Sequence, residues 1–207
     1  MKSNIDYTLY LVTDRDVLVN TDIYTEVEEA IKGGVTLVQI REKSVGTLEF
    51  YNLSVKIKTI TDKYEIPLII NDRIDIAQAI DAAGVHLGQN DMPADIARRI
   101  LGKNKIIGVS ANTLKEALKA ERQGADYIGV GAMFPTTTKD DASAVTINCL
   151  KEIKEGISIP VVAIGGISDK NVAQLLPTNI DGIAVVSAIL GKGSVKIAAE
   201  KLRVLIK

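Results

Sequence analysis

Cysteine is almost absent from this chain, since Cys149 is the only one among 207 residues. A single cysteine cannot form an internal disulfide, which excludes a disulfide-stapled extracellular scaffold. Long apolar runs are also missing: a stretch such as 183–186 is far too short to cross a bilayer, and residues 1–6 lack the apolar segment of a secretory signal. We therefore expect a cytoplasmic protein with no membrane partner.

Aromatic residues are scarce, with no tryptophan and two phenylalanines. Platforms on which single-stranded nucleic acid could stack are therefore not expected. The 25 basic and 26 acidic residues nearly cancel, so no broad basic surface for nucleic acid is indicated either. What the chain does have is apolar content, 46% of its residues, which is sufficient for one core. We expect one domain over residues 1–207, and the sequence is compatible with a homo-oligomer.

Short runs rich in β-branched residues alternate with longer amphipathic stretches along the whole chain. The runs predict strands at 7–12, 36–40, 66–70, 84–87, 105–109, 126–130, 159–164 and 181–186. The amphipathic stretches predict helices near 22–32, 47–64, 75–79, 113–123, 147–155 and 194–205, with one more beginning near Pro93. The pattern is that of eight strands, each followed by a helix.

This alternation predicts an α/β fold with an all-parallel sheet, because parallel neighbours need a crossover between them. Eight such units in a chain of this length fit a compact (β/α)8 barrel of the TIM-barrel type. A doubly wound open sheet is the alternative, but no nucleotide-binding glycine fingerprint follows the first strand. In a barrel the active site lies at the C-terminal ends of the strands, and polar residues gather there in this sequence.

The segment 38–43, Val-Gln-Ile-Arg-Glu-Lys, is the most informative of these strand ends. Side chains alternate between the two faces of a strand, which places Gln39, Arg41 and Lys43 together on one face. A row of one amide and two cations is costly in a dry core unless the charges have partners. A highly charged anionic ligand supplies them, because arginine presents a planar fork of donors to phosphate oxygens and lysine a compact charge.

Two carboxylates follow neighbouring strands, Asp72 after the third and Asp91 after the fourth, with Asn71 beside them. Each aspartate could simply cap the helix that follows it. Together they suit Mg²⁺, which takes one or two carboxylates and completes its shell with water and substrate phosphates. Lys139 adds a further cation after the sixth strand, and the threonines at 136–138 add hydroxyl donors. This much positive charge fits a diphosphate better than one monophosphate.

A second anion site is indicated at the ends of the seventh and eighth strands. Gly165-Gly166 and Val186-Ser187 occupy positions at which many barrels bind phosphate through backbone amides and the N-terminus of a short helix, here expected at 187–190. An ordinary tight turn is the alternative for the glycine pair, and a helix cap for Ser187 or for Ser110 after the fifth strand. Two anionic ligands, a magnesium diphosphate and a phosphomonoester, suggest transfer of a group from the first to the second.

Taken together, these segments resemble the thiamin phosphate synthase family over nearly the whole chain. The matching motifs occur in order at 38–43, 70–73, 84–89, 108–111, 135–139, 163–167 and 184–189. The resemblance implies a (β/α)8 transferase of thiamin biosynthesis that joins a hydroxymethylpyrimidine diphosphate to a thiazole phosphate, with Mg²⁺ as cofactor and small molecules as partners. It further implies a dissociative mechanism, in which pyrophosphate leaves first and the thiazole nitrogen captures the pyrimidine carbocation.

The resemblance also assigns roles to individual positions. Asp72 and Asp91 would hold Mg²⁺, and Gln39 would contact the aminopyrimidine. The expected holders of the diphosphate or its pyrimidine are Arg41, Lys43, Asn71, Ser110 and Lys139, and all of these except Asn71 are expected to be catalytic. The expected thiazole phosphate ligands are Thr136, Thr137, Thr138, Gly166, Val186 and Ser187.

Three rival interpretations remain open. A thiazole tautomerase, a relative with the same fold, is expected to carry a histidine in the loop after the fifth strand, where this chain has Asn112. The only histidine, His86, lies on the fourth strand and is interpreted as a structural residue that faces opposite to Val85 and Leu87. A non-catalytic sensor of thiamin precursors would not need the carboxylate pair, and a phosphosugar isomerase barrel would leave the three cations unexplained.

Overall fold

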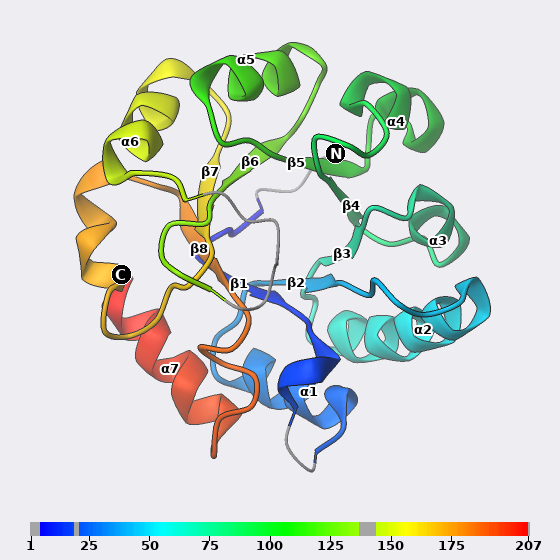
Figure 1. The fold of residues 1–207 in the computed structure, drawn as a ribbon. Helices are drawn as coiled ribbons and strands as arrows, with labels where there is room; N and C mark the ends of the chain where they lie inside the picture. Colours follow the sequence, from blue (N-terminus) through cyan, green and yellow to red (C-terminus); the bar gives the residue numbers. More distant parts are fainter. Residues whose placement is uncertain (1–4, 19–20, 137–143, 207) are drawn as a thin grey trace.

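The computed structural model describes residues 5–18, 21–136 and 144–206. Its centre is a closed barrel in which each strand pairs in parallel with the next and β8 pairs with β1 (Figure 1). The strands are β1 (Leu9–Val12), β2 (Leu37–Ile40), β3 (Leu68–Asn71), β4 (Gly84–Leu87), β5 (Ile106–Ser110), β6 (Tyr127–Val130), β7 (Val161–Ile164) and β8 (Gly182–Val185). The predicted α/β fold and (β/α)8 barrel are confirmed, and the open-sheet alternative is wrong.

The helices form a ring around the barrel (Figure 1). They are α1 (Ile23–Lys32), α2 (Thr47–Lys63), α3 (Ile74–Ala79), α4 (Ala94–Leu101), α5 (Leu114–Arg122), α6 (Ile147–Gly156) and α7 (Val195–Leu205). Side chains cap several of them: Asp22 accepts hydrogen bonds from backbone N–H groups of α1, and Thr113 with Glu116 forms a capping box at α5. No helix in the described part of the chain is long and apolar enough to cross a membrane.

The prediction that every strand is followed by a helix is wrong after β7. The connection to β8 instead holds two short 3-10 turns, η2 (Val172–Gln174) and η3 (Leu176–Thr178), orange in Figure 1. Pro177 lies in the first turn of η3, where it has no N–H with which to extend a helix from upstream. Asn179 follows in the left-handed conformation at φ 54°, which ends the turn. These two residues therefore prevent a regular α-helix between the last two strands.

Strand alternation divides the core into two layers. One set of strand side chains, including Leu11, Ile70 and Val85, packs together with apolar residues of the surrounding helices. A smaller cluster, which includes the buried Tyr10 and Tyr127, fills the barrel interior. This inner cluster fills the barrel below the strand ends, and residues at the C-terminal mouth above it line a cavity.

Candidate active site

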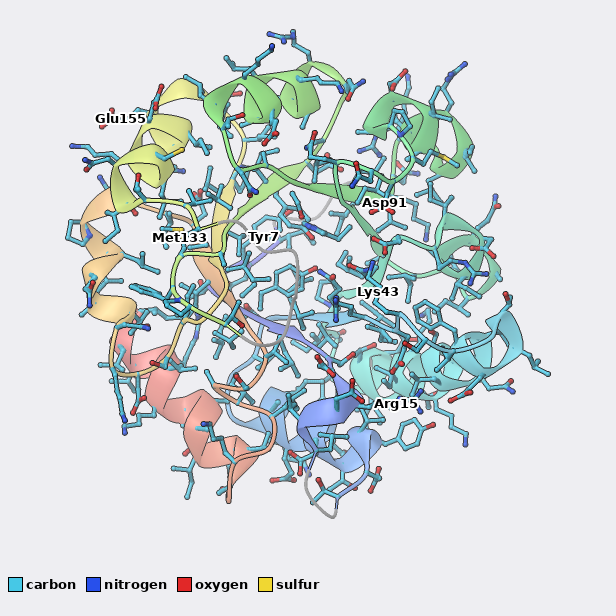
Figure 2. All side chains as sticks on the ribbon, in the orientation of Figure 1. Tyr7, Arg15, Lys43, Asp91, Met133 and Glu155 are labelled. Atoms are coloured by element: carbon cyan, nitrogen blue, oxygen red, sulfur yellow. The ribbon has the colours of Figure 1, made fainter. Side chains whose placement is uncertain are left out.

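A cavity of about 310 Å³ lies at the C-terminal ends of the strands. All eight strands, or the loops that follow them, contribute to its wall. The predicted site residues that line it are Gln39, Arg41, Lys43, Asn71, Asp72, Asp91, Ser110, Thr136, Gly166, Val186 and Ser187. The predicted residues Thr137, Thr138 and Lys139 lie outside the described residues. In Figure 2, Lys43 and Asp91 lie near the barrel mouth, whereas Glu155 lies on the outer rim of the molecule.

The alternating row at the end of β2 lies as predicted, although the strand itself ends just before Arg41. Gln39, Arg41 and Lys43 all line the cavity. Glu42 does not, and it forms an ion pair with Arg15 in which the carboxylate oxygen lies 2.8 Å from Nε. The amide and the two cations therefore face one ligand space.

Sequence reasoning missed the loop after β1, which supports this row. Thr13 is fully buried, and its hydroxyl accepts a hydrogen bond of 3.1 Å from the backbone N–H of Arg41. Asp14 Oδ2 lies 3.9 Å from Arg41 Nη1. These contacts hold the arginine at the edge of the cavity. The signal was available, because the polar run Thr13-Asp14-Arg15 directly follows a strand, as the recognised site residues do.

The two carboxylates meet at the mouth of β3 and β4. Asp72 accepts a short hydrogen bond from Lys43 Nζ, and Asp91 Oδ2 accepts one of 2.7 Å from the backbone N–H of Gly88. Burial raises the pKa of the Asp72 carboxyl, and the neighbouring Asp91 carboxylate raises it further against the opposing hydrogen bond from Lys43. The Asp91 carboxylate therefore disfavours the charged form of Asp72, and a cation between the two would stabilise it.

Neither aspartate is a helix cap, so the capping interpretation is wrong for both. The N-cap of α3 is Arg73 and that of α4 is Pro93, and neither helix has a side-chain cap hydrogen bond. Asp72 instead adopts a left-handed φ of 60°, a conformation that aspartate tolerates better than most residues. The cap of α5 is Thr113, so Ser110 does not cap either.

The carboxylate pair suits Mg²⁺, which can take its other ligands from water and substrate, better than it suits a metal whose ligands all come from the protein. In the described ranges there is no group of three or more His, Cys, Asp or Glu side chains that could hold a metal. Mg²⁺ needs only one or two carboxylates when water and substrate phosphates supply its other oxygen ligands. Asp72 and Asp91 are therefore a suitable donor set only together with a phosphate ester.

A line of hydrogen bonds connects the two sides of the cavity through the barrel interior. Gln39 Nε2 donates to Tyr10 Oη at 2.6 Å, and the Tyr10 and Tyr127 hydroxyls lie 2.9 Å apart. His86 Nδ1 lies 2.9 Å from Tyr127 Oη, and His86 Nε2 lies 2.9 Å from Ser110 Oγ. We call these five side chains the polar relay. Burial raises the pKa of both phenols well above the ordinary value, so both keep their protons.

His86 faces the cavity, opposite to Val85 and Leu87, as predicted from strand alternation. Its two ring nitrogens both have partners inside the barrel, so it does more than fill the core. Tyr10 and Tyr127 could not be recognised from the sequence, because a tyrosine in a β-rich run is equally consistent with core packing.

Two further polar residues near Ser110 complete this side of the wall. Gln89 Nε2 donates to the Ser110 carbonyl at 2.6 Å and lines the cavity, although sequence reasoning gave it no role. Asn112 also lines the cavity, and its backbone N–H donates to Glu116 Oε2 at 2.7 Å. The position where a tautomerase would carry histidine is therefore part of the cavity wall.

The opposite wall is built from backbone. Gly165 and Gly166 adopt positive φ angles of 95° and 65°, and a Cβ at Gly166 would lie 2.5 Å from the Pro135 carbonyl oxygen. The predicted short helix at 187–190 is wrong: the segment is a turn, with the Leu190 N–H bonded to the Val186 carbonyl at 2.9 Å. Gly191 follows at φ 70° and ends it. Gly166, Val186 and Ser187 line the cavity on this side.

The sequence matches the family model for thiamine monophosphate synthase over residues 9–189. A curated relative from Clostridium tetani, named thiamine-phosphate synthase, is 62% identical over 199 residues, which are 96% of this chain and 95% of the relative. The protein of the same name from Alkaliphilus oremlandii is 58% identical over 209 residues and 100% of both chains.

Solved structures of similar proteins agree with these sequence matches. Thiamine phosphate pyrophosphorylase from Pyrococcus furiosus matches with a TM-score of 0.90 and 42% identity, covering 98% of this chain and 96% of that one. The (S)-3-O-geranylgeranylglyceryl phosphate synthase of Thermoplasma acidophilum matches with a TM-score of 0.71 and 16% identity, covering 97% and 93% of the two chains. This second likeness shows the fold alone.

Proposed function

Since this chain belongs to the thiamine monophosphate synthase family and is a transferase that forms thiamin phosphate, we propose that its cavity joins a hydroxymethylpyrimidine diphosphate to a thiazole phosphate and releases pyrophosphate. The observation that carries this proposal is that two chemically different walls line one cavity. Cationic and carboxylate side chains line the cavity at the ends of β2 to β4. Glycines and the residues that follow β8 line it at the ends of β7 and β8. The whole chain, 1–207, would act as one domain with this mouth as its active site.

The diphosphate would lie against the first of these walls. Arg41 and Lys43 supply charge-assisted hydrogen bonds, and Asn71 and Ser110 supply neutral donors. Lys139, outside the described residues, would add a cation from the loop after β6. Lys43 now pairs with Asp72, so diphosphate binding would share its ammonium group between the carboxylate and the ligand.

Mg²⁺ would be held by Asp72 and Asp91 together with oxygens of the diphosphate. When bound, it would supply positive charge that stabilises the departing pyrophosphate. The chain's own contribution is to keep the two carboxylates together, through the Gly88 N–H on Asp91 and the left-handed backbone at Asp72.

The thiazole phosphate would bind at the second wall. Gly166 would bring a backbone N–H close to the phosphate, and Val186 and Ser187 would contact it from the neighbouring strand end. Thr136 would close this wall from the loop after β6, with Thr137 and Thr138 beyond the described residues. The two ligands would then meet in the middle of the cavity.

The reaction would need alignment and charge stabilisation more than a base. Gln39 would hold the aminopyrimidine while Arg41, Lys43 and Ser110 stabilise the negative charge that develops on pyrophosphate as the carbon–oxygen bond breaks. The resulting pyrimidine carbocation would be captured by the thiazole nitrogen, which already carries the electron pair for the new carbon–nitrogen bond. A cytoplasmic location belongs to the same proposal and rests on the single cysteine.

The test is direct synthesis. The purified protein is incubated with the pyrimidine diphosphate, the thiazole phosphate and Mg²⁺, and thiamin phosphate is measured by mass. Matched reactions omit the thiazole phosphate or replace Mg²⁺ with EDTA, and neither should give product. Binding of both substrates without product would instead support a sensor of thiamin precursors.

A further inference from the structure

The polar relay has a direction, because most of its members have only one proton to donate. Each tyrosine hydroxyl and a neutral imidazole carry one proton apiece, so a donor at one end fixes every later bond. When the Gln39 amide donates through Nε2 to Tyr10, the Tyr10 proton is left for Tyr127, whose oxygen lies 2.9 Å away. Tyr127 then donates to His86 Nδ1, which leaves the histidine proton on Nε2. His86 passes that hydrogen bond to Ser110 Oγ, and the serine proton is left for a ligand.

The reverse arrangement needs only a rotation of the Gln39 amide. If Oε1 faced Tyr10, that tyrosine would donate to Gln39 and accept from Tyr127. The imidazole proton would move to Nδ1, and Ser110 would donate to Nε2 rather than to a ligand. The relay therefore has two complete states, and each state gives the cavity a different pair of groups. The forward state offers Oε1 of Gln39 as an acceptor and Ser110 as a donor.

We propose that the relay couples the two ends of the pyrimidine diphosphate site, with Tyr10, Tyr127 and His86 as positioning residues; this inference rests on the proposed function. The amino group of an aminopyrimidine is a donor, so it selects the state in which Gln39 presents Oε1. Diphosphate oxygens only accept, so they select the state in which Ser110 presents its proton. Both ends of one substrate select the forward state, and binding at either end prepares the other.

The surrounding packing keeps the relay in line. A Cβ at Gly108 would lie 2.1 Å from Cζ of Tyr127, and a Cβ at Gly129 would lie 3.1 Å from Cε1 of His86. Glycine at 108 therefore leaves the Tyr127 ring its room, whereas a Cβ at 129 would make a tight contact with the His86 ring. Tyr7 packs on the Tyr127 ring with centroids 4.9 Å apart, but it shares no hydrogen bond with the relay in the described part of the chain.

The first test reads the histidine proton directly. His86 is the only histidine, so isotope-labelled histidine gives a single imidazole in nitrogen–proton NMR spectra without assignment. We expect the Nε2–H tautomer in the parent protein, and a larger share of it when Mg²⁺ and inorganic pyrophosphate are added. Gln39→Met removes the donor that sets the direction of the relay, so the share of the Nε2–H tautomer should fall, and in a Tyr127→Phe background the same change should have no effect.

The matched control is Tyr7→Phe, which removes a phenol hydroxyl from the same aromatic cluster but outside the relay. It should leave the tautomer unchanged. If Tyr127→Phe does not fold, Tyr10→Phe cuts the relay one step earlier and should likewise abolish the effect of Gln39→Met on the tautomer. A tautomer share that Gln39→Met leaves unchanged in the parent or changes equally in the cut relay, or a parent protein with the proton on Nδ1, overturns the proposal.

The second test measures coupling between the ends. Gln39→Met and Ser110→Ala are combined in a double-mutant cycle on kcat/KM, first in the parent and then in Tyr127→Phe. Gln39 and Ser110 would also be coupled because both would contact the same substrate. The difference in coupling between the parent and Tyr127→Phe therefore measures the part that depends on the relay. We expect a departure from additivity of about threefold or more in the parent and within about twofold in Tyr127→Phe. Equal departures in both backgrounds contradict the relay.

The two tests separate this inference from the proposed function. The tautomer measurement uses pyrophosphate and needs no turnover, so it can succeed even if no thiamin phosphate is formed. A parent enzyme that makes thiamin phosphate but carries the wrong tautomer leaves the synthase activity standing and removes only the relay.

Discussion

Gly108 and Tyr127 share one space inside the barrel, since the tyrosine ring occupies the position that a Cβ of residue 108 would take, 2.1 Å from Cζ. The ring lies across the interior and is fully buried. Gly108→Ala should therefore overpack the inner cluster and reduce the free energy of unfolding by about 1–3 kcal/mol. Chemical denaturation measures this change. Gly193→Ala is the control, because a Cβ there meets nothing within 4 Å. Equal stability of both variants would show that the ring moves aside at no cost.

The carboxylate pair should be essential for turnover but not for folding. Asp72→Asn and Asp91→Asn each keep the shape of the side chain and remove the negative charge that would hold Mg²⁺. We expect each to lower kcat about a hundredfold or more, as loss of a central electrostatic group does. Asp169→Asn is the matched control, since this aspartate lies outside the cavity and pairs with Lys201 at 2.6 Å. Full activity of both site variants in EDTA contradicts the metal site.

The arginine at the end of β2 should act on the departure of pyrophosphate. Arg41→Ala should slow the single-turnover rate about ten- to a hundredfold, because a charge-assisted hydrogen bond contributes roughly 1.5–3 kcal/mol. Arg73→Ala is the control, since Arg73 pairs with Asp75 and does not line the cavity. If the two variants have the same single-turnover rate as the parent, Arg41 is not a ligand of the leaving group.

The backbone wall should affect one substrate and not the other. Gly166→Ala places a Cβ 2.5 Å from the Pro135 carbonyl and at a φ of 65°, which would push the wall away from the thiazole phosphate. We expect a higher KM for the thiazole phosphate with little change in KM for the pyrimidine diphosphate. Steady-state kinetics with each substrate varied in turn measures this split. Equal increases in both constants, with the fold preserved in circular dichroism, would indicate one shared subsite.

The tautomerase rival should fail a proton-exchange test. Asn112 is an amide and cannot act as a base near neutral pH, and its backbone is held by Glu116 at the start of α5. We expect no enzyme-dependent exchange of hydrogen on a thiazole carboxylate phosphate in deuterated buffer, followed by NMR. Fast exchange that disappears in His86→Asn would assign the isomerisation to this chain.

Much of the site could be predicted because one rule covers it. Residues that follow parallel strands meet at one end of a barrel, and this placed Asp72, Asp91 and Gly166 together without any knowledge of their contacts. The relay could not be predicted in the same way. Tyr10 and Tyr127 belong to strands that are far apart in the sequence, and periodicity gives the face of a side chain but not the partner that it reaches across the barrel.

The repeated strand–helix pattern could be predicted from the sequence, but the missing helix after β7 could not. Alternating periodicity identified eight strands, whereas the missing helix after β7 depends on Pro177 and on the left-handed Asn179, two local signals within a short connection. Similarly, the turn at 187–190 stops because Gly191 takes a positive φ, which a pattern of apolar residues does not encode.

The pairing of β1 with β8 has a consequence for how the active site forms during folding. Leu9 lies beside Ile183, so the first and last strands of the barrel join only after all the strands between them have been made. Bringing together such distant segments carries a loop-closure entropy that local contacts do not offset, and topologies with many distant contacts fold slowly. Since the cavity takes residues from every strand, an unclosed barrel does not hold the complete site. Activity should therefore appear in a single step late in refolding, together with ring closure, rather than in proportion to helix content.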